Sequence, residues 1–144
     1  MTGIFMVLAI VILATAFGLW HRSNSGRMKT VEHRSAGTTE HGVAILDAQT
    51  IGVDLGARAT LVQFSSAFCQ PCRATRQILI EVSGMVDGVA HVDIDAEANL
   101  DLVRALGIRR TPTVLVLDEE GRIRRRASGL PRKVDVIAAL GQLD

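Results

Sequence analysis

The two cysteines of this 144-residue chain stand three positions apart, in the stretch Cys69-Gln70-Pro71-Cys72. A structural disulfide between residues this close closes almost no loop, so it would stabilise the fold very little. Two thiols at this spacing suit another chemistry, in which one forms a mixed disulfide with a second molecule and the other resolves it. The pair therefore predicts dithiol–disulfide exchange.

The residues around the pair predict where it lies in the fold. Residues 60–64 (TLVQF) form a short apolar run that is typical of a buried central strand. Apolar residues then recur at helical spacing, and Gly84 and Gly88 mark the end of that helix; they are Ala74, Ile78, Val82 and Met85. Cys69 is thus expected at the first turn of a helix, where unpaired N–H groups and the helix dipole stabilise a thiolate, and Cys72 one turn further on.

The rest of the chain predicts an α/β domain with a central sheet flanked by helices. Further strands are expected at residues 43–46, 89–95, 113–117 and 122–128, the last of them a polar edge strand. Further helices are expected at residues 98–106 and from Pro131 onward, while residues 47–57 remain ambiguous. Helices thus alternate with strands after the cysteine pair, as in α/β folds.

This pattern resembles the thioredoxin family over about 100 residues, from 42 to 144. The features that match are the Cys-X-Pro-Cys unit between a strand and a helix, the sequence VDID at 92–95 and the sequence GIRRTPTVLVL at 107–117. Thr111-Pro112 matches the family's residue pair with a cis-proline, and Gly129 matches another family glycine. The resemblance implies a thioredoxin fold with a mixed β-sheet.

The resemblance also implies a role for each matching residue. Cys69 corresponds to the attacking nucleophile and Cys72 to the resolving thiol, and Pro71 to the proline that shapes the active-site helix. Pro112, if cis, would block metal capture by the cysteines and hold Thr111 so that its backbone pairs with an extended substrate segment. We expect no cofactor beyond the two cysteines. The expected substrates are protein thiols or disulfides, with a further partner that donates or accepts electrons, and the chain is expected to be a monomer.

Several positions depart from the reducing thioredoxins. Phe68 stands where the family has tryptophan before the first cysteine, Gln70 replaces glycine inside the motif, and Ser65 replaces a tryptophan on the preceding strand. Gln63 replaces the buried acid six residues before the first cysteine, and an amide cannot accept its proton. His91 takes the place of the family lysine. These changes favour a dedicated relative similar to the membrane-tethered TlpA-like group, and the middle proline favours reduction over oxidation.

The N-terminus carries a long apolar segment. Residues 3–20 hold no charge, and a helix of this length spans roughly 27 Å, close to the thickness of the hydrocarbon core. We interpret residues 1–20 as an uncleaved single-span anchor, with Trp20 at the interface. A cleaved signal peptide is the alternative, because Ala14-Thr15-Ala16 resembles a cleavage site, although no basic residue precedes the apolar run.

The polar residues 21–41 are predicted to be a flexible linker to the domain at 42–144. Arg22, Arg27, Lys29 and Arg34 follow the apolar segment, and by the positive-inside rule they place the domain in the cytoplasm. Family context and the signal-like character of the segment favour the extracytoplasmic face, which we adopt, while the cytoplasmic face remains the alternative.

The net charge and the small number of possible metal ligands argue against other functions. A net charge of +1 gives no reason to expect a nucleic-acid partner. A zinc site needs about four ligands, whereas His21, His33 and His41 fall in the linker and only His91 in the domain, so no metal site is predicted. Copper delivery by two thiolates and one histidine, without redox turnover, remains the alternative function.

Overall fold

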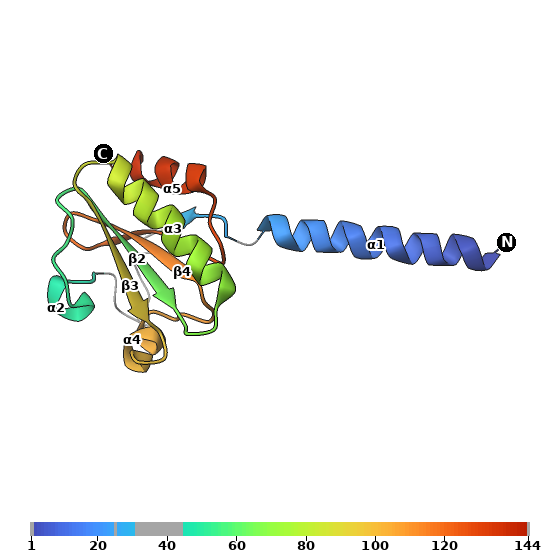
Figure 1. Cartoon of the computed structure of the whole chain (residues 1–144), viewed down its shortest axis with the longest axis horizontal. Coiled ribbons are helices and arrows are strands. Elements are labelled where there is room, and N and C mark those ends of the chain that lie inside the picture. The colour runs from blue at the N-terminus through green and yellow to red at the C-terminus, as the bar shows by residue number, and fades with distance from the viewer. Residues whose placement is uncertain (1, 25, 31–44, 144) are drawn as a thin grey trace, which may run out of the picture.

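The computed structural model describes residues 2–24, 26–30 and 45–143, and it shows a long N-terminal helix followed by an α/β domain (Figure 1). The helices are α1 (Thr2–Asn24), α2 (Ala48–Ile51), α3 (Gln70–Met85), α4 (Leu100–Ala105) and α5 (Lys133–Leu140). The strands are β1 (Lys29–Thr30), β2 (Ala59–Ser65), β3 (Val89–Asp95), β4 (Thr113–Asp118) and β5 (Ile123–Ser128).

The strands form one mixed sheet in the order β1-β5-β4-β2-β3. Strands β2 and β3 run parallel and are connected by α3 as a crossover, whereas the other neighbouring strands in the described residues are antiparallel. Strand β2 lies between β4 and β3, and all seven of its residues are buried. The expected central mixed sheet flanked by helices is confirmed.

Alternate residues of the central strands fill two cores, one on each face of the sheet. On one face, α3 and α5 pack on a cluster that consists of Ala59, Leu61, Leu79, Val82, Val114, Val116, Ala127, Val136, Ala139 and Leu140. On the other face lie α2 and α4, with Leu46, Ile51, Val62, Phe64, Val92, Ile94, Leu106, Leu115, Leu117 and Ile123. Figure 1 shows the two pairs of helices on opposite sides of the strands. Packing on both faces of the sheet holds the C-terminal end of β2, and with it the start of α3, in a fixed position.

The prediction that the strand at 122–128 forms the edge of the sheet was wrong for part of its length. β1 pairs antiparallel with β5, so that Lys29 lies opposite Arg126 and Thr30 opposite Arg125. Arg126 is only half exposed, and its guanidinium donates to the Leu106 carbonyl at 2.6 Å. Burial lowers the pKa of Arg126 from its ordinary value. The basic run is therefore part of the packed structure and not simply a solvated edge.

The predicted linker at residues 21–41 also differs from the structure where that segment is described. Helix α1 continues to Asn24, and the Gly26 amide donates to the Ser128 carbonyl at 2.9 Å, directly ahead of β1. Residues 31–41 lie outside the described residues, as do Val43 and Ala44 of the predicted strand at 43–46. Ile45 forms a single bridge with Arg122. Residues 21–24 of the expected linker thus belong to α1, and residues 26–30 are held on the sheet.

Helix α1 contains the apolar segment noted in the sequence. The stretch Gly3–Trp20 has a mean hydropathy of 2.4 and none of it is buried against the rest of the chain. In Figure 1 the helix extends away from the α/β domain. By length and composition it is a candidate membrane span, either an anchor or a signal sequence.

Candidate active site

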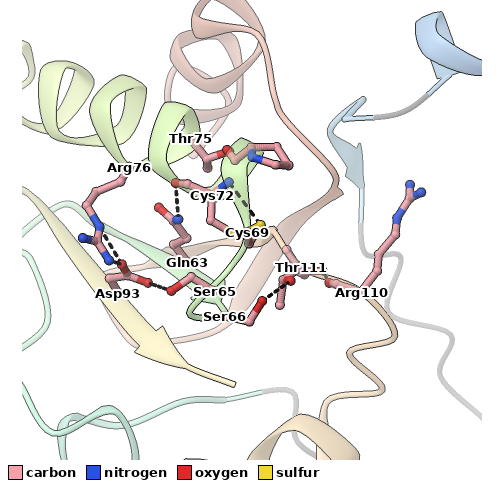
Figure 2. The surroundings of a disulfide bond; sticks show 12 residues. Gln63, Ser65, Ser66, Cys69, Cys72, Thr75, Arg76, Asp93, Arg110 and Thr111 are labelled. Carbon is pink, nitrogen blue, oxygen red and sulfur yellow. Dashed lines mark hydrogen bonds and ion pairs between the residues drawn. A yellow bond between two sulfur atoms is a disulfide. The ribbon is translucent and has the colours of Figure 1, made fainter. Parts of the chain in front are cut away.

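Cys69 and Cys72 are joined by a disulfide at the start of α3, with their Cα atoms 5.2 Å apart (Figure 2). The strand β2 ends at Ser65, and a short loop leads from there to Cys69. Cys69 is the N-cap residue of α3, with extended backbone angles, and Pro71 lies in the first turn. Proline suits this position because its missing N–H would have no partner inside the helix.

The sulfur of Cys69 faces the open N-terminus of the helix. The Cys72 amide donates to Cys69 Sγ at 3.2 Å, so the sulfur takes the place that a side-chain oxygen has in an ordinary N-cap. The Thr75 hydroxyl donates to the Pro71 carbonyl at 2.9 Å and supports the same turn. Once the disulfide is reduced, this amide and the helix dipole can stabilise negative charge on Cys69.

The two sulfurs differ in their access to solvent. Cys69 is half exposed, whereas Cys72 retains only 4% of its accessible surface. Gln70 and Pro71 are exposed beside them, and Phe68 is 99% exposed. Cys69 is therefore the more accessible of the two sulfurs, and the exposed Phe68 directly precedes it in the chain.

A second loop, which precedes β4, closes the site from the opposite side. The Thr111–Pro112 peptide bond is cis. Ser66 and Thr111 share a hydrogen bond between their hydroxyls at 3.0 Å, which links this loop to the one that carries Cys69. The Gly129 amide donates to the Pro112 carbonyl at 2.7 Å, so the turn after β5 supports the same loop.

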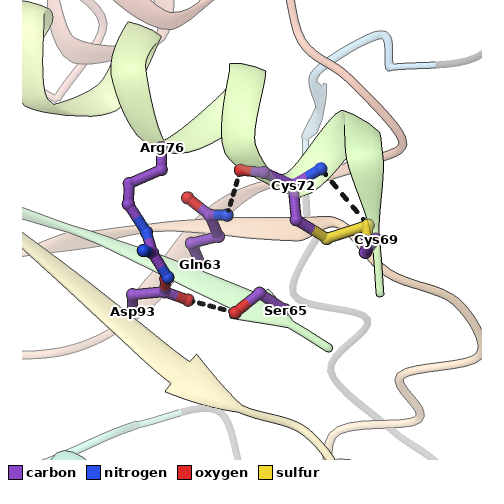
Figure 3. A network of polar contacts seen from close by, with 6 residues as sticks. All are labelled: Gln63, Ser65, Cys69, Cys72, Arg76 and Asp93. Carbon is purple, nitrogen blue, oxygen red and sulfur yellow. Dashed lines mark hydrogen bonds and ion pairs between the residues drawn. A yellow bond between two sulfur atoms is a disulfide. The ribbon is translucent and has the colours of Figure 1, made fainter. Parts of the chain in front are cut away.

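Gln63 lies directly beneath the cysteines. It is fully buried on β2, and its Nε2 donates to the Cys72 carbonyl at 2.9 Å (Figure 3). Its Oε1 has no hydrogen-bond partner among the described residues. The amide therefore holds the first turn of α3 on the sheet, but it offers no ionisable group to Cys72.

A polar network beside Gln63 was not predicted from the sequence. The Ser65 hydroxyl donates to Asp93 Oδ1 at 2.5 Å, and Arg76 on α3 forms an ion pair with the other carboxylate oxygen, with its Nε at 2.7 Å (Figure 3). Asp93 and Gln63 are register partners on β3 and β2. The signal was present only in the pairing register, which places Ser65 and Asp93 on the same face.

His91 stands on the same face of β3 as Asp93. Burial lowers the pKa of His91 from its ordinary value, an effect that the negative charge of Asp93 opposes and the positive charge of Arg76 reinforces. Its Nε2 is buried without a hydrogen-bond partner among the residues that the structure describes. The side chain is therefore expected to be neutral in the folded protein near pH 7.

Within residues 2–24, 26–30 and 45–143, no three His, Cys, Asp or Glu side chains gather in a way that could hold a metal ion. Of the histidines that a copper site could use, His33 and His41 lie outside the described residues, and the side chain of His21 is likewise not described. The site consists of a solvent-facing sulfur with a shielded partner sulfur behind it.

Comparisons with known proteins agree with this geometry. A thioredoxin family model matches residues 47–141. The thioredoxin of Mycoplasma pneumoniae is 27% identical over 82 residues, which are 57% of this chain and 79% of that protein. Human thioredoxin domain-containing protein 2 is 27% identical over 86 residues, which are 60% of this chain but only 16% of that protein.

Solved structures show the same likeness. Chloroplastic thioredoxin z superposes with a TM-score of 0.55 and 26% sequence identity, over 60% of this chain and 79% of that one. Thioredoxin-2 of a malaria parasite superposes with a TM-score of 0.56 over 74% of this chain and 99% of that one. Its 18% identity bears on the fold alone.

Proposed function

The chain belongs to the thioredoxin family, and from that premise we propose that it is a membrane-anchored thiol–disulfide oxidoreductase that reduces disulfides in other proteins. The observation that carries this proposal is the difference between the two sulfurs. Cys69 is a half-exposed N-cap residue that accepts from the Cys72 amide, whereas Cys72 is shielded. The exposed sulfur can therefore attack a disulfide of another protein, and the shielded sulfur can then resolve the mixed disulfide.

The exchange proceeds in two steps that balance sulfur and electrons. The Cys69 thiolate attacks one sulfur of the substrate disulfide, and the other substrate sulfur leaves as a thiolate that takes up a proton. Cys72 then loses its proton and attacks Cys69 Sγ, which releases the second substrate sulfur. The substrate has gained two electrons and two protons, and the chain holds the Cys69–Cys72 disulfide. A dithiol partner protein must reduce it again.

The loop at Thr111–Pro112 supplies the binding surface in this proposal. Thr111 lies beside Cys69 in Figure 2, and its hydroxyl is linked to that of Ser66 by a hydrogen bond. An extended substrate segment can pair with the backbone of this loop by strand addition, while exposed Phe68 covers its apolar side chains. Gln70 and Pro71 are exposed beside the cysteines and complete this binding surface, and Gln63 holds the first turn of α3 beneath it.

The direction of transfer is tested by the reduction potential of the Cys69/Cys72 pair, measured by equilibration with glutathione or a reference thioredoxin. A reductant is expected to lie near the roughly −270 mV of thioredoxin, and an oxidant near the roughly −120 mV of DsbA. A value close to the oxidant's would contradict the reducing role while leaving dithiol–disulfide exchange intact.

We assign the anchoring function to α1. Its apolar stretch of 18 residues is long enough to cross the hydrocarbon core and is not buried against the rest of the protein. Mass spectrometry of the mature protein tests this assignment. An intact N-terminus in the membrane fraction supports the anchor, whereas a chain that begins after Ala16 and is found in the soluble fraction contradicts it.

A further inference from the structure

The candidate anchor is attached to the domain at the active-site loop itself. Residues 26–30, which we call the clasp, follow α1 and end in β1. The Gly26 amide donates to the Ser128 carbonyl at 2.9 Å, and Arg110 donates to the same oxygen at 2.8 Å. Arg110 stands two residues before the cis-proline, and Gly129 supports Pro112 from behind. One carbonyl thus joins the clasp to the loop that faces the disulfide.

Gly26 is required for this contact. It is buried and has φ +82°, a conformation that other residues rarely adopt. An added Cβ would overlap the carbonyl oxygen of Leu130 and lie 2.6 Å from its carbonyl carbon. These are backbone atoms, so they cannot move aside as a flexible side chain would. A larger residue at position 26 would therefore lift the clasp from the turn at 128–130.

The clasp shortens the connection between the bilayer and the domain. The apolar span ends at Trp20, and four more helical residues lead to Asn24, which is about 6 Å. Two further residues to Gly26 add at most about 7 Å. Since headgroups extend roughly 5 to 8 Å beyond the hydrocarbon, Gly26 is held within about 8 Å of them. Residues 31–44 follow β1 in the chain and so do not lengthen this connection.

A site held close to the bilayer favours partners that present their disulfide at a similar height. Two proteins confined to one membrane react at a raised effective concentration, and this advantage is lost when a rigid connection cannot bring the groups together. Resting on the proposed function, we propose that the preferred substrate of Cys69 is a disulfide carried near the bilayer surface by a second membrane-anchored protein.

The test uses the reduced full-length chain reconstituted in vesicles with anchored model substrates. Each substrate has one membrane span, a rigid helical spacer of 0 to 20 residues in steps of four, and a disulfide-bonded hairpin. Each step raises the hairpin by about 6 Å. We expect single-turnover rates to pass through an optimum, with the longest spacer slower by about tenfold or more. Equal rates for all spacers would overturn the proposal.

A variant of the anchor makes the test sharper. Four helix-forming residues inserted after Trp20 should raise the domain by about 6 Å and move the optimum outward by one step. The insertion leaves residues 26–143 unchanged, so the rate with the same hairpin in soluble form should stay the same. An optimum that does not move would contradict the proposal. If the soluble hairpin is not reduced at all, the proposed function fails instead.

A matched pair of glycine variants tests the clasp. Gly52 has φ +78°, close to that of Gly26, but an added Cβ there meets nothing within 4 Å. Gly26→Val should flatten the dependence on spacer length, measured as the ratio of anchored to soluble rates, whereas Gly52→Val should preserve it. A Gly26→Val profile as sharp as that of the wild type would show that the clasp does not set the height.

Discussion

At the scale of single residues, the two cysteines are expected to differ in reactivity. Cys69 accepts from the Cys72 amide at the N-terminus of α3, whereas Cys72 is nearly inaccessible. A thiolate on Cys69 is therefore better stabilised and easier to reach. Brief alkylation of the reduced protein with iodoacetamide between about pH 6 and 8, followed by peptide mapping, should label Cys69 first. Preferential labelling of Cys72 would reverse the proposed roles.

Gln63 is predicted to slow the second step of the exchange. Cys72 must lose a proton before it attacks Cys69, and the buried amide beneath it offers no base. A positioned base typically contributes about 10²-fold or more to proton transfer, so Gln63→Asp should speed resolution of the mixed disulfide at neutral pH. Stopped-flow kinetics measure this step.

The same substitution has a cost that must be measured beside the rate. The introduced carboxylate would be buried, and burial disfavours the charged form and destabilises the fold. Gln63→Asn, which changes size in the same way but adds no base, is the matched control. A folded Gln63→Asp protein that resolves no faster than Gln63→Asn would rule out the missing base as the slow step.

His91 is predicted to make stability depend on pH. Burial lowers the pKa of His91 in the folded state below the unfolded value of about 6.5. Between these two values the unfolded state binds more protons, so stability is full above about pH 6.5 and falls as the pH drops. His91→Gln should lose less stability between about pH 7.5 and 5.5 in urea unfolding. An equal loss in both proteins would contradict this account.

Sequence patterns reveal residue roles unevenly. The Cys-X-Pro-Cys unit and Thr111-Pro112 are local signals, so the candidate site could be predicted from them. The link from Ser65 and Arg76 to Asp93 could not, because it joins residues 17 and 28 positions apart through the sheet register. The shared contacts at the Ser128 carbonyl were missed for the same reason.

At the scale of elements, α3 is expected to depend on its buried face. Leu79 is fully buried in the cluster beneath α3 and α5, whereas its neighbour Ile80 is 54% exposed. Leu79→Ala removes packed methyl groups and leaves a cavity, so it should cost about 2 to 5 kcal/mol of unfolding free energy. Ile80→Ala is the matched control and should cost far less. Comparable losses in denaturant unfolding would show that the helix is not held by this face.

Elements with strong local patterns were predicted closely. Strand β3 has the predicted bounds, Val89–Asp95, whereas β2 is one residue longer than predicted at each end and β4 is one residue longer at its C-terminal end. The two-residue strand β1 was missed, because its sequence is polar and its formation depends on β5, nearly 100 residues away. The alternation and periodicity of apolar residues indicate which face of a segment is buried. They do not indicate which strand the segment pairs with, because pairing also depends on the partner strand.

At the scale of the whole molecule, membrane orientation is the open prediction. We predict that the domain lies on the extracytoplasmic face, although the basic residues that follow the apolar segment favour the cytoplasm. Protease added to sealed right-side-out vesicles should therefore cleave the domain, and inverted vesicles should protect it. The opposite pattern would place it in the cytoplasm, as the positive-inside rule alone indicates.

The central claim is that Cys69 attacks the disulfide of another protein and Cys72 releases the product. The most direct measurement mixes reduced Cys72→Ser protein with a disulfide-bonded protein substrate and identifies the adducts by non-reducing mass spectrometry. The account predicts a stable mixed disulfide at Cys69, none with Cys69→Ser, and only transient adducts with the wild type. Adducts carried by Cys72 in the Cys69→Ser protein, or no adduct at Cys69, would contradict it.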